Sequence, residues 1–169
     1  MAIVCTTRVF AVDVEQVPFP DGSGRTHEIA TVRHAPCVVL IPVLDDGRVV
    51  LIRQYRHSVG RVLWEFPAGS IDPGESPEAA AMRECEEETK LAPARVERLG
   101  ALFPAPGYCD EEMFFFRATG LHAPAADSTH KADEDEDISV HPTTVAEARA
   151  LLANGDIVDL KTAYALTLI

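Results

Sequence analysis

The chain has 169 residues, a length that suits a single domain with a sizeable core. Lys and Arg number 15 against 27 Asp and Glu, and the formal net charge of −12 argues against nonspecific binding to nucleic acid or anionic membranes. Hydrophobic residues make up 47% of the chain but form no run of membrane-spanning length, so we expect a globular protein without nucleic-acid or membrane partners.

Alternating apolar and polar residues predict two strands near the N-terminus, at residues 7–17 and 26–33. The segment between them is rich in Pro, Gly and Asp and predicts a turn. Residues 1–33 should therefore form an antiparallel hairpin or small sheet, and residues 34–169 the rest of a single domain that spans residues 1–169.

A second hairpin is predicted next. The apolar run at residues 37–44 indicates a buried strand, the sequence at 45–48 contains the Asp-Gly turn signal, and residues 49–55 are predicted to return as the partner strand. Residues 62–66 predict a short strand that leads into a loop at residues 69–74.

A helix is predicted to begin at Ser76-Pro77, because Ser is favoured as an N-cap and Pro at the first helical position. The elements predicted after it are strands at 95–103, 112–118 and 138–141, loops at 104–111 and 121–137, and helices at 144–153 and 159–169. This interleaving predicts an α/β fold in which helices cover both sides of a mixed sheet.

The four cysteines are widely spaced and form no CxxC pair: Cys5, Cys37, Cys85 and Cys109. Such spacing is typical of free thiols in a reducing compartment and not of a zinc ribbon or a disulfide framework. The first residues also lack the plan of a signal peptide. We therefore expect a cytoplasmic protein.

Three carboxylates are predicted to gather on one side of the first helix, because Glu84, Glu87 and Glu88 are spaced i, i+3 and i+4. Like charges so placed are unfavourable unless a cation is present, and oxygen-only ligands suit Mg²⁺ or Mn²⁺ better than Zn²⁺. Arg83 lies four residues before Glu87 and could hold it in place. The turn at Ala68 could offer a backbone carbonyl as a further ligand.

A solvated acidic helix face is the alternative, but the wider spacing argues against it. Residues 69–91 read G-x5-E-x7-R-E-apolar-x-E-E-x-x-apolar, a match expected on the order of once in 10⁸ at a given start. The segment resembles the Nudix box, the signature of the Nudix hydrolases. Lys90 departs from it, because the box has a Gly there that ends the helix in a left-handed turn. We expect Lys90 to cost some stability or to shift the helix end.

The resemblance covers roughly residues 38–169 and implies a Nudix-type α/β/α sandwich with a mixed sheet between helices. It also implies metal-dependent hydrolysis of a nucleoside diphosphate linked to another moiety. The implied ligands of two or three Mg²⁺ ions, with Mn²⁺ possible, are Glu84, Glu87, Glu88 and the Ala68 carbonyl. Arg83 and Glu87 are also expected among the catalytic residues.

The loop at residues 104–111 is similar to that of the ADP-ribose pyrophosphatase branch of this family. Pro106 lies fifteen residues after Leu91, and Glu111 follows at a matching spacing. The resemblance implies that Glu111 binds the terminal ribose or helps to arrange metal. An ordinary loop proline is the alternative for Pro106.

The acidic stretch D-E-D-E-D-I at residues 133–138 resembles the segment that contains the branch's proposed general base. This implies Glu134 as the base, with Glu136 as the alternative. Such a group is needed because a water that attacks phosphorus must lose its proton. A solvated loop is the simpler interpretation of these acids.

The stretch R-Q-Y-R at residues 53–56 resembles a third conserved stretch of the family, and Arg suits bidentate contact with phosphate. The resemblance implies that Arg56 contacts the diphosphate, that Arg53 also binds substrate, and that Glu65 pairs with substrate or metal. Alternatively, both arginines lie on an exposed strand edge and neutralise nearby acids.

The implied substrate is ADP-ribose, with AMP and ribose 5-phosphate as products. The implied assembly is a homodimer in which residues 1–33 complete the partner's pocket. The alternatives are another nucleotide sugar such as GDP-mannose, a dinucleoside polyphosphate, or a noncatalytic nucleotide sensor. Sensors usually lose box carboxylates, and here all of them are present.

Overall fold

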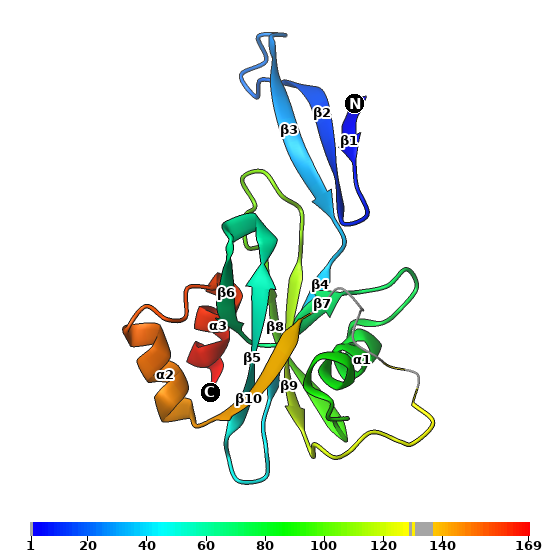
Figure 1. The fold of residues 1–169 in the computed structure, drawn as a ribbon. Coiled ribbons are helices and arrows are strands. Elements are labelled where there is room, and N and C mark those ends of the chain that lie inside the picture. Colours follow the sequence, from blue (N-terminus) through cyan, green and yellow to red (C-terminus); the bar gives the residue numbers. More distant parts are fainter. Residues whose placement is uncertain (1, 129, 131–136) are drawn as a thin grey trace.

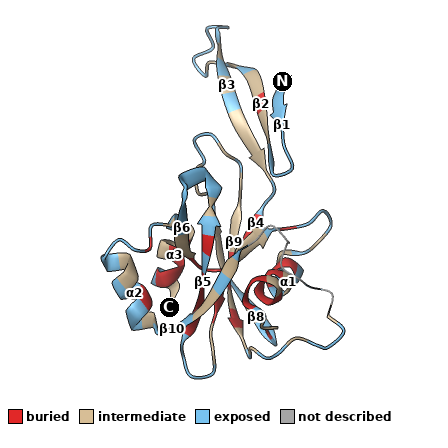
Figure 2. Cartoon of the chain, viewed as in Figure 1, coloured by how far each residue is buried: buried red, intermediate tan, exposed pale blue. Residues whose placement is uncertain are grey.

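The computed structural model describes residues 2–128, 130 and 137–169, whose strands form three sheets (Figure 1). One antiparallel sheet projects from the end of the molecule and consists of β1 (Ala2–Thr6), β2 (Phe10–Pro18) and β3 (Thr26–His34). The predicted hairpin of the two longer strands is confirmed, and β1 is an addition that the sequence analysis did not predict. Few side chains in this sheet are buried (Figure 2).

The other seven strands form two sheets in the body of the molecule. The four-stranded sheet has the order β7 (Ala68–Ser70), β4 (Cys37–Pro42), β9 (Met113–Thr119) and β8 (Arg95–Leu102). The three-stranded sheet has the order β10 (Ile138–Thr143), β5 (Val49–Arg56) and β6 (Arg61–Glu65). Strands β4 and β9 are parallel and their neighbours antiparallel, so the predicted mixed pairing is confirmed.

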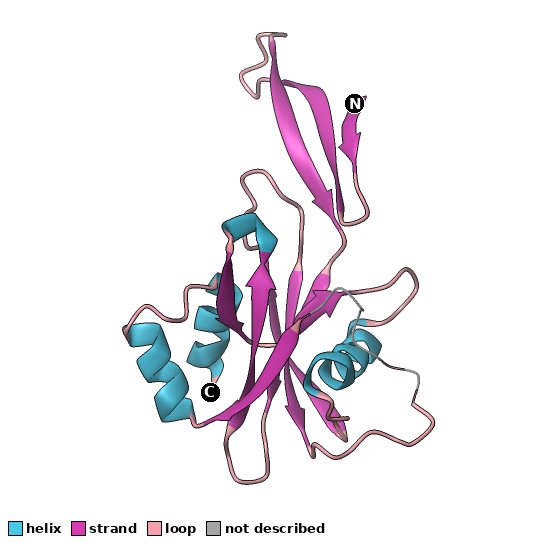
Figure 3. Ribbon diagram, in the orientation of Figure 1, coloured by secondary structure: helices cyan, strands magenta, loops and turns pink. Residues whose placement is uncertain are grey.

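Helices lie on both sides of these sheets (Figure 3). The long helix α1 (Pro77–Thr89) is on one side, and α2 (Val145–Ala153) and α3 (Leu160–Ala165) are on the other. Short 3-10 turns are η1 (His57–Val59) and η2 (Leu166–Leu168). No helix in the described part of the chain is long and apolar enough to cross a membrane. The predicted α/β/α arrangement is confirmed.

Strand β4 is the centre of the core because every residue in it is buried. Val38 and Leu40 pack on the side of α1, whereas Val39 and Ile41 pack against α2 and α3. Successive side chains of a strand point to opposite faces, so a strand covered on both faces is apolar throughout. This explains the continuous apolar run that the sequence shows.

The predicted hairpin of residues 37–44 and 49–55 is wrong. Strands β4 and β5 belong to different sheets, and in the described residues the two segments share only an isolated bridge between Val43, just beyond β4, and Val49. The turn from Leu44 to Arg48 nevertheless forms as expected. Both edges of β4 are occupied by β7 and β9. Long-range pairing of a fully buried strand therefore prevails over the local hairpin signal.

Two smaller differences concern short elements. Residues 68–70, predicted partly as loop, form the edge strand β7 on β4. The predicted C-terminal helix at 159–169 is α helical only to Ala165 and then continues as the 3-10 turn η2. The helix α2 begins as predicted, with a capping box between Thr144 and Glu147.

Candidate active site

Helix α1 begins and ends at defined caps. The Ser76 hydroxyl accepts a hydrogen bond from the Ala79 N–H, and Pro77 occupies the first turn, as predicted. At the other end Lys90 takes the left-handed conformation, with φ 62°, and its N–H donates to the Glu86 carbonyl. The helix therefore ends where the family's glycine would end it, and the end is not shifted. Lys90 also donates from Nζ to the Glu87 carbonyl at 2.6 Å.

Arg83 connects three carboxylates of the predicted box. Its Nε and Nη2 donate to Glu75 at 3.0 and 2.8 Å, and its Nη1 donates to Glu84 at 2.7 Å and to Glu87 at 2.9 Å. The hydrogen bonds to Glu75 are the main cause of a raised pKa for the Arg83 guanidinium, and Glu84 and Glu87 raise it further. The predicted contact between Arg83 and Glu87 is confirmed.

Ala68 and Gly69 of β7 lie directly against the carboxylates of α1. The Ala68 N–H donates to Glu88 Oε2 at 3.1 Å, and Glu88 is almost completely buried. A Cβ on Gly69 would lie only 2.1 Å from the carboxyl carbon of Glu84. A residue with a Cβ at this position would therefore have to displace that carboxylate, so the backbone of β7 lies directly against the acidic side of α1.

The donor set fits a hard divalent cation, because it consists of carboxylate and backbone oxygens. Within the described residues, no three His, Cys, Asp or Glu side chains are already grouped to hold a metal ion. Arg83 instead supplies the positive charge between Glu84 and Glu87. The role of Glu84, Glu87, Glu88 and the Ala68 carbonyl as ligands stays a prediction.

Arg56 and Glu65 form a bidentate ion pair. Arg56 Nε and Nη2 each donate to one oxygen of Glu65 at 2.8 Å, and Glu65 is only 1% exposed. Burial raises the pKa of Glu65, but Arg56 and Lys161 lower it by more, so the net shift is downward. The hydrogen bonds to Glu65 are the main cause of the raised pKa of Arg56, and the charges of Glu88 and Asp159 raise it further.

Lys161 is a member of this group that the sequence analysis missed. Its Nζ contacts Glu65 Oε2 and lies 3.1 Å from Asp159 Oδ1. Asp159 is the N-cap of α3, and Thr162 in the same turn accepts a hydrogen bond from the Phe66 N–H at 2.8 Å. Nothing in the sequence near Lys161 signals a partner 96 positions away.

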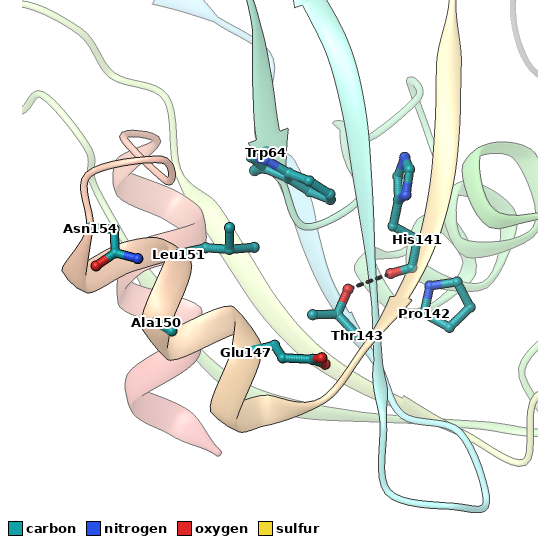
Figure 4. A pocket seen from close by; sticks show the side chains of 8 residues that line it. All are labelled: Trp64, His141, Pro142, Thr143, Glu147, Ala150, Leu151 and Asn154. Carbon is teal, nitrogen blue, oxygen red and sulfur yellow. Dashed lines mark hydrogen bonds between the residues drawn. The ribbon is translucent and has the colours of Figure 1, made fainter.

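Arg53 lies apart from the Arg56–Glu65 ion pair. It is three positions from Arg56 on β5, and residues three apart on a strand point to opposite faces. Its guanidinium is 5.1 Å from the centre of the Trp64 ring, which meets the His141 ring at 4.9 Å. These rings border a hollow of about 410 Å³ between β10 and α2 (Figure 4). Arg53 and Arg56 are therefore directed to opposite faces of β5, and the role of each in substrate binding stays a prediction.

Glu111 lies in the loop that joins β8 to β9 and contacts residues at the start of β4. Its Oε1 lies 3.6 Å from His34 Nδ1, and its carboxylate interacts with the buried thiol of Cys37. Burial is the main cause of the raised pKa of that thiol; Glu111 and Glu84 raise it further, and Lys161 lowers it. Charged groups from three separate parts of the chain, the β8–β9 loop, α1 and α3, therefore act on the Cys37 thiol.

The remaining predicted residues are Pro106, Glu134 and Glu136. Pro106 is in a turn in which the Cys109 N–H donates to the Ala105 carbonyl at 2.9 Å. Glu134 and Glu136 lie outside the described residues. Ser128, in the described part of the loop that follows β9, contacts Glu86 on α1 through its Oγ.

Comparisons with known proteins identify the family of this chain. The model of the NUDIX domain family matches residues 33–162. The ADP-ribose pyrophosphatase of Bacillus subtilis is 34% identical over 94% of this chain and 84% of its own length. The ADP-ribose pyrophosphatase of Mycobacterium tuberculosis is 36% identical over 91% and 73%. A crystal structure of an ADP compounds hydrolase superimposes with a TM-score of 0.81 and 28% identity, covering 99% of this chain and 88% of that one. The chain therefore belongs to the Nudix family.

Proposed function

We propose that the protein hydrolyses the diphosphate bond of a nucleoside diphosphate linked to another moiety, and that its substrate is ADP-ribose, cleaved to AMP and ribose 5-phosphate. The observation that carries the proposal is the Arg83 network, which joins Glu75, Glu84 and Glu87 beside the Ala68 turn. The complete set of box carboxylates disfavours a noncatalytic sensor, because sensors usually lose some of them. The names of the two pyrophosphatase relatives support the choice of substrate.

The proposed cofactor is Mg²⁺, with Mn²⁺ as the alternative, held by Glu84, Glu87, Glu88 and the Ala68 carbonyl. A bound divalent ion would neutralise the diphosphate and lower the pKa of a bound water. Glu84 and Glu88 are largely buried, so their charge is poorly screened by solvent, which favours cation binding.

The side chains have separate proposed tasks. Arg83 holds Glu87 in place, and Arg56, fixed by Glu65, offers its guanidinium to the diphosphate. Glu111, in the loop that joins β8 to β9, binds the substrate. Glu134 or Glu136 accepts the proton of the attacking water, which must leave as the new bond to phosphorus forms.

The proposed assembly is a homodimer formed through the N-terminal sheet. Ile3 and Val4 of β1 are 65% and 62% exposed, and Val9 and Phe10 are also exposed. A projecting sheet with apolar side chains in water gains stability when a second surface covers it. The location is proposed to be cytoplasmic.

The test is phosphate release, after coupling to a phosphatase, from ADP-ribose, GDP-mannose, UDP-glucose, NADH, diadenosine polyphosphates and nucleoside triphosphates in the presence of Mg²⁺. The expected result is a clear preference for ADP-ribose that is lost in Glu88→Gln. The matched control is Glu97→Gln, on the exposed face of β8, which should keep full activity. Preference for another substrate would overturn the ADP-ribose assignment, and no turnover by the wild type would favour a sensor.

A further inference from the structure

The loop between β8 and β9 joins the N-terminal sheet to the body of the molecule. The Val32 N–H donates to the Tyr108 carbonyl at 2.7 Å, and the Asp110 N–H donates to the Val32 carbonyl at 3.1 Å. Val32 also forms a parallel bridge with Cys109. The end of β3 is therefore paired with the same loop that contains Glu111.

Asp110 strengthens this junction with its side chain. One carboxylate oxygen accepts from the His34 N–H at 2.9 Å, and the other lies 3.1 Å from Arg33 Nη1. Arg33 is itself fixed from the other side, because its Nε donates at 2.7 Å to Asp13, which is buried on β2. Asp110 thus binds two successive residues at the point where the sheet meets the core.

The contacts continue residue by residue along the two segments. Beyond Asp110, the Glu111 carboxylate lies 3.6 Å from His34 Nδ1 and interacts with the Cys37 thiol. Beyond Glu111, the Glu112 carbonyl accepts from the Cys37 N–H at 2.9 Å. Glu111 is therefore held between two anchored neighbours, one of which depends on the N-terminal sheet.

We propose that Asp110, held by Arg33 and the His34 N–H, is a positioning residue that fixes Glu111 for substrate binding. The N-terminal sheet then contributes to the site of its own chain through this junction. This inference rests on the proposed function, in which Glu111 contacts the substrate. Asp110 and Arg33 are both about 40% exposed as side chains, so their pair contributes little to folding, whereas a displacement of about 1 Å at a substrate contact can cost up to 100-fold in activity.

The test compares KM and kcat for ADP-ribose in Asp110→Ala, Asp110→Asn and wild type, all in full-length protein with Mg²⁺. We expect Asp110→Ala to raise KM about tenfold with kcat within twofold. Asp110→Asn should recover part of the loss, because its amide oxygen still accepts from His34. The matched control is Asp46→Ala, which removes an exposed ion pair with Arg48 in the turn between β4 and β5 and should leave KM unchanged.

A wild-type KM in both Asp110 variants would overturn the inference, and so would a loss of folded protein with unchanged KM in the folded fraction. If Asp110→Ala does not fold, Asp110→Asn alone decides, with a rise in KM of at least threefold expected. Turnover by the wild type and its loss in Glu88→Gln are measured in the same assay. If the wild type does not turn over ADP-ribose, or if Glu88→Gln keeps its activity, both the proposed function and this inference are overturned. An unchanged KM in active Asp110 variants overturns the inference alone.

Discussion

Arg56 holds Glu65 by two parallel hydrogen bonds of 2.8 Å, in a place where Glu65 is almost inaccessible to solvent. A buried carboxylate is stable only when its charge is balanced and its oxygens accept hydrogen bonds. Here Lys161 provides the second cation from α3. Both carboxylate oxygens of Glu65 are thereby paired with cations. The main effect of Glu65 is therefore to orient Arg56.

Removal of the second cation should destabilise the fold. We expect Lys161→Met to lower the free energy of unfolding by about 2 kcal/mol, because Glu65 keeps Arg56 but loses half of its compensation. The matched control is Arg48→Met, which removes an exposed pair with Asp46 and should cost less than about 1 kcal/mol. Urea denaturation measures both, and equal losses would contradict the view that Lys161 compensates a buried charge.

The space beside Gly69 should be essential for activity. A methyl group there would lie 2.1 Å from the Glu84 carboxyl carbon, so Gly69→Ala must displace that carboxylate or the strand. We expect kcat/KM to fall by about 100-fold. Gly100→Ala is the control, because a Cβ at Gly100 meets nothing within 4 Å. Similar activity of the two variants, measured by phosphate release, would exclude tight packing at Gly69 as a requirement.

Lys90 should be a site of avoidable strain. Its φ of 62° costs an L-residue about 1–2 kcal/mol, and glycine avoids this strain. Glycine, however, loses more conformational entropy on folding, which offsets part of the gain. Lys90→Gly should therefore raise the free energy of unfolding by about 0.5–1 kcal/mol. Lys90→Ala keeps the strain and loses the hydrogen bond to the Glu87 carbonyl, so it should not stabilise. Thermal unfolding of both variants decides; a stabilised alanine variant would contradict the explanation.

Acid should weaken the junction at Asp110. The His34 N–H is the main cause of a pKa for Asp110 below its ordinary 3.8, and Arg33 lowers it further. A carboxyl group whose pKa is lowered by folding contributes stability above its unfolded pKa and loses it as the pH falls through the folded value. The difference in unfolding free energy between wild type and Asp110→Asn should thus be constant from pH 7 to about 5 and shrink below 3.8. An equal difference at pH 7 and pH 3 would contradict this.

The sequence predicts the features that depend on neighbours along the chain. The start of α1 at Ser76, the capping box at Thr144 and the contact from Arg83 to Glu87 are all set within four residues, and all are confirmed. Such patterns are local, so spacing alone is enough to identify them.

Features that depend on distant pairing could not be predicted in this way. The hairpin of residues 37–44 and 49–55 failed because β9, some 76 residues beyond β4, competes for the same edge. Lys161 was missed because its acid lies 96 positions away. The crowding between Gly69 and Glu84 is also a tertiary contact, although the glycine itself was part of the recognised motif.

The parallel pairing of β4 with β9 also sets an order of events during synthesis. The sheet β1–β3 is built from consecutive antiparallel strands and can close once residue 34 has been made. Strand β4, however, pairs from Cys37 with Met113 and needs the chain as far as Thr119. Until then its apolar edge lacks that partner, so nascent chains that stop before residue 113 should aggregate, and chaperones should matter most in that interval.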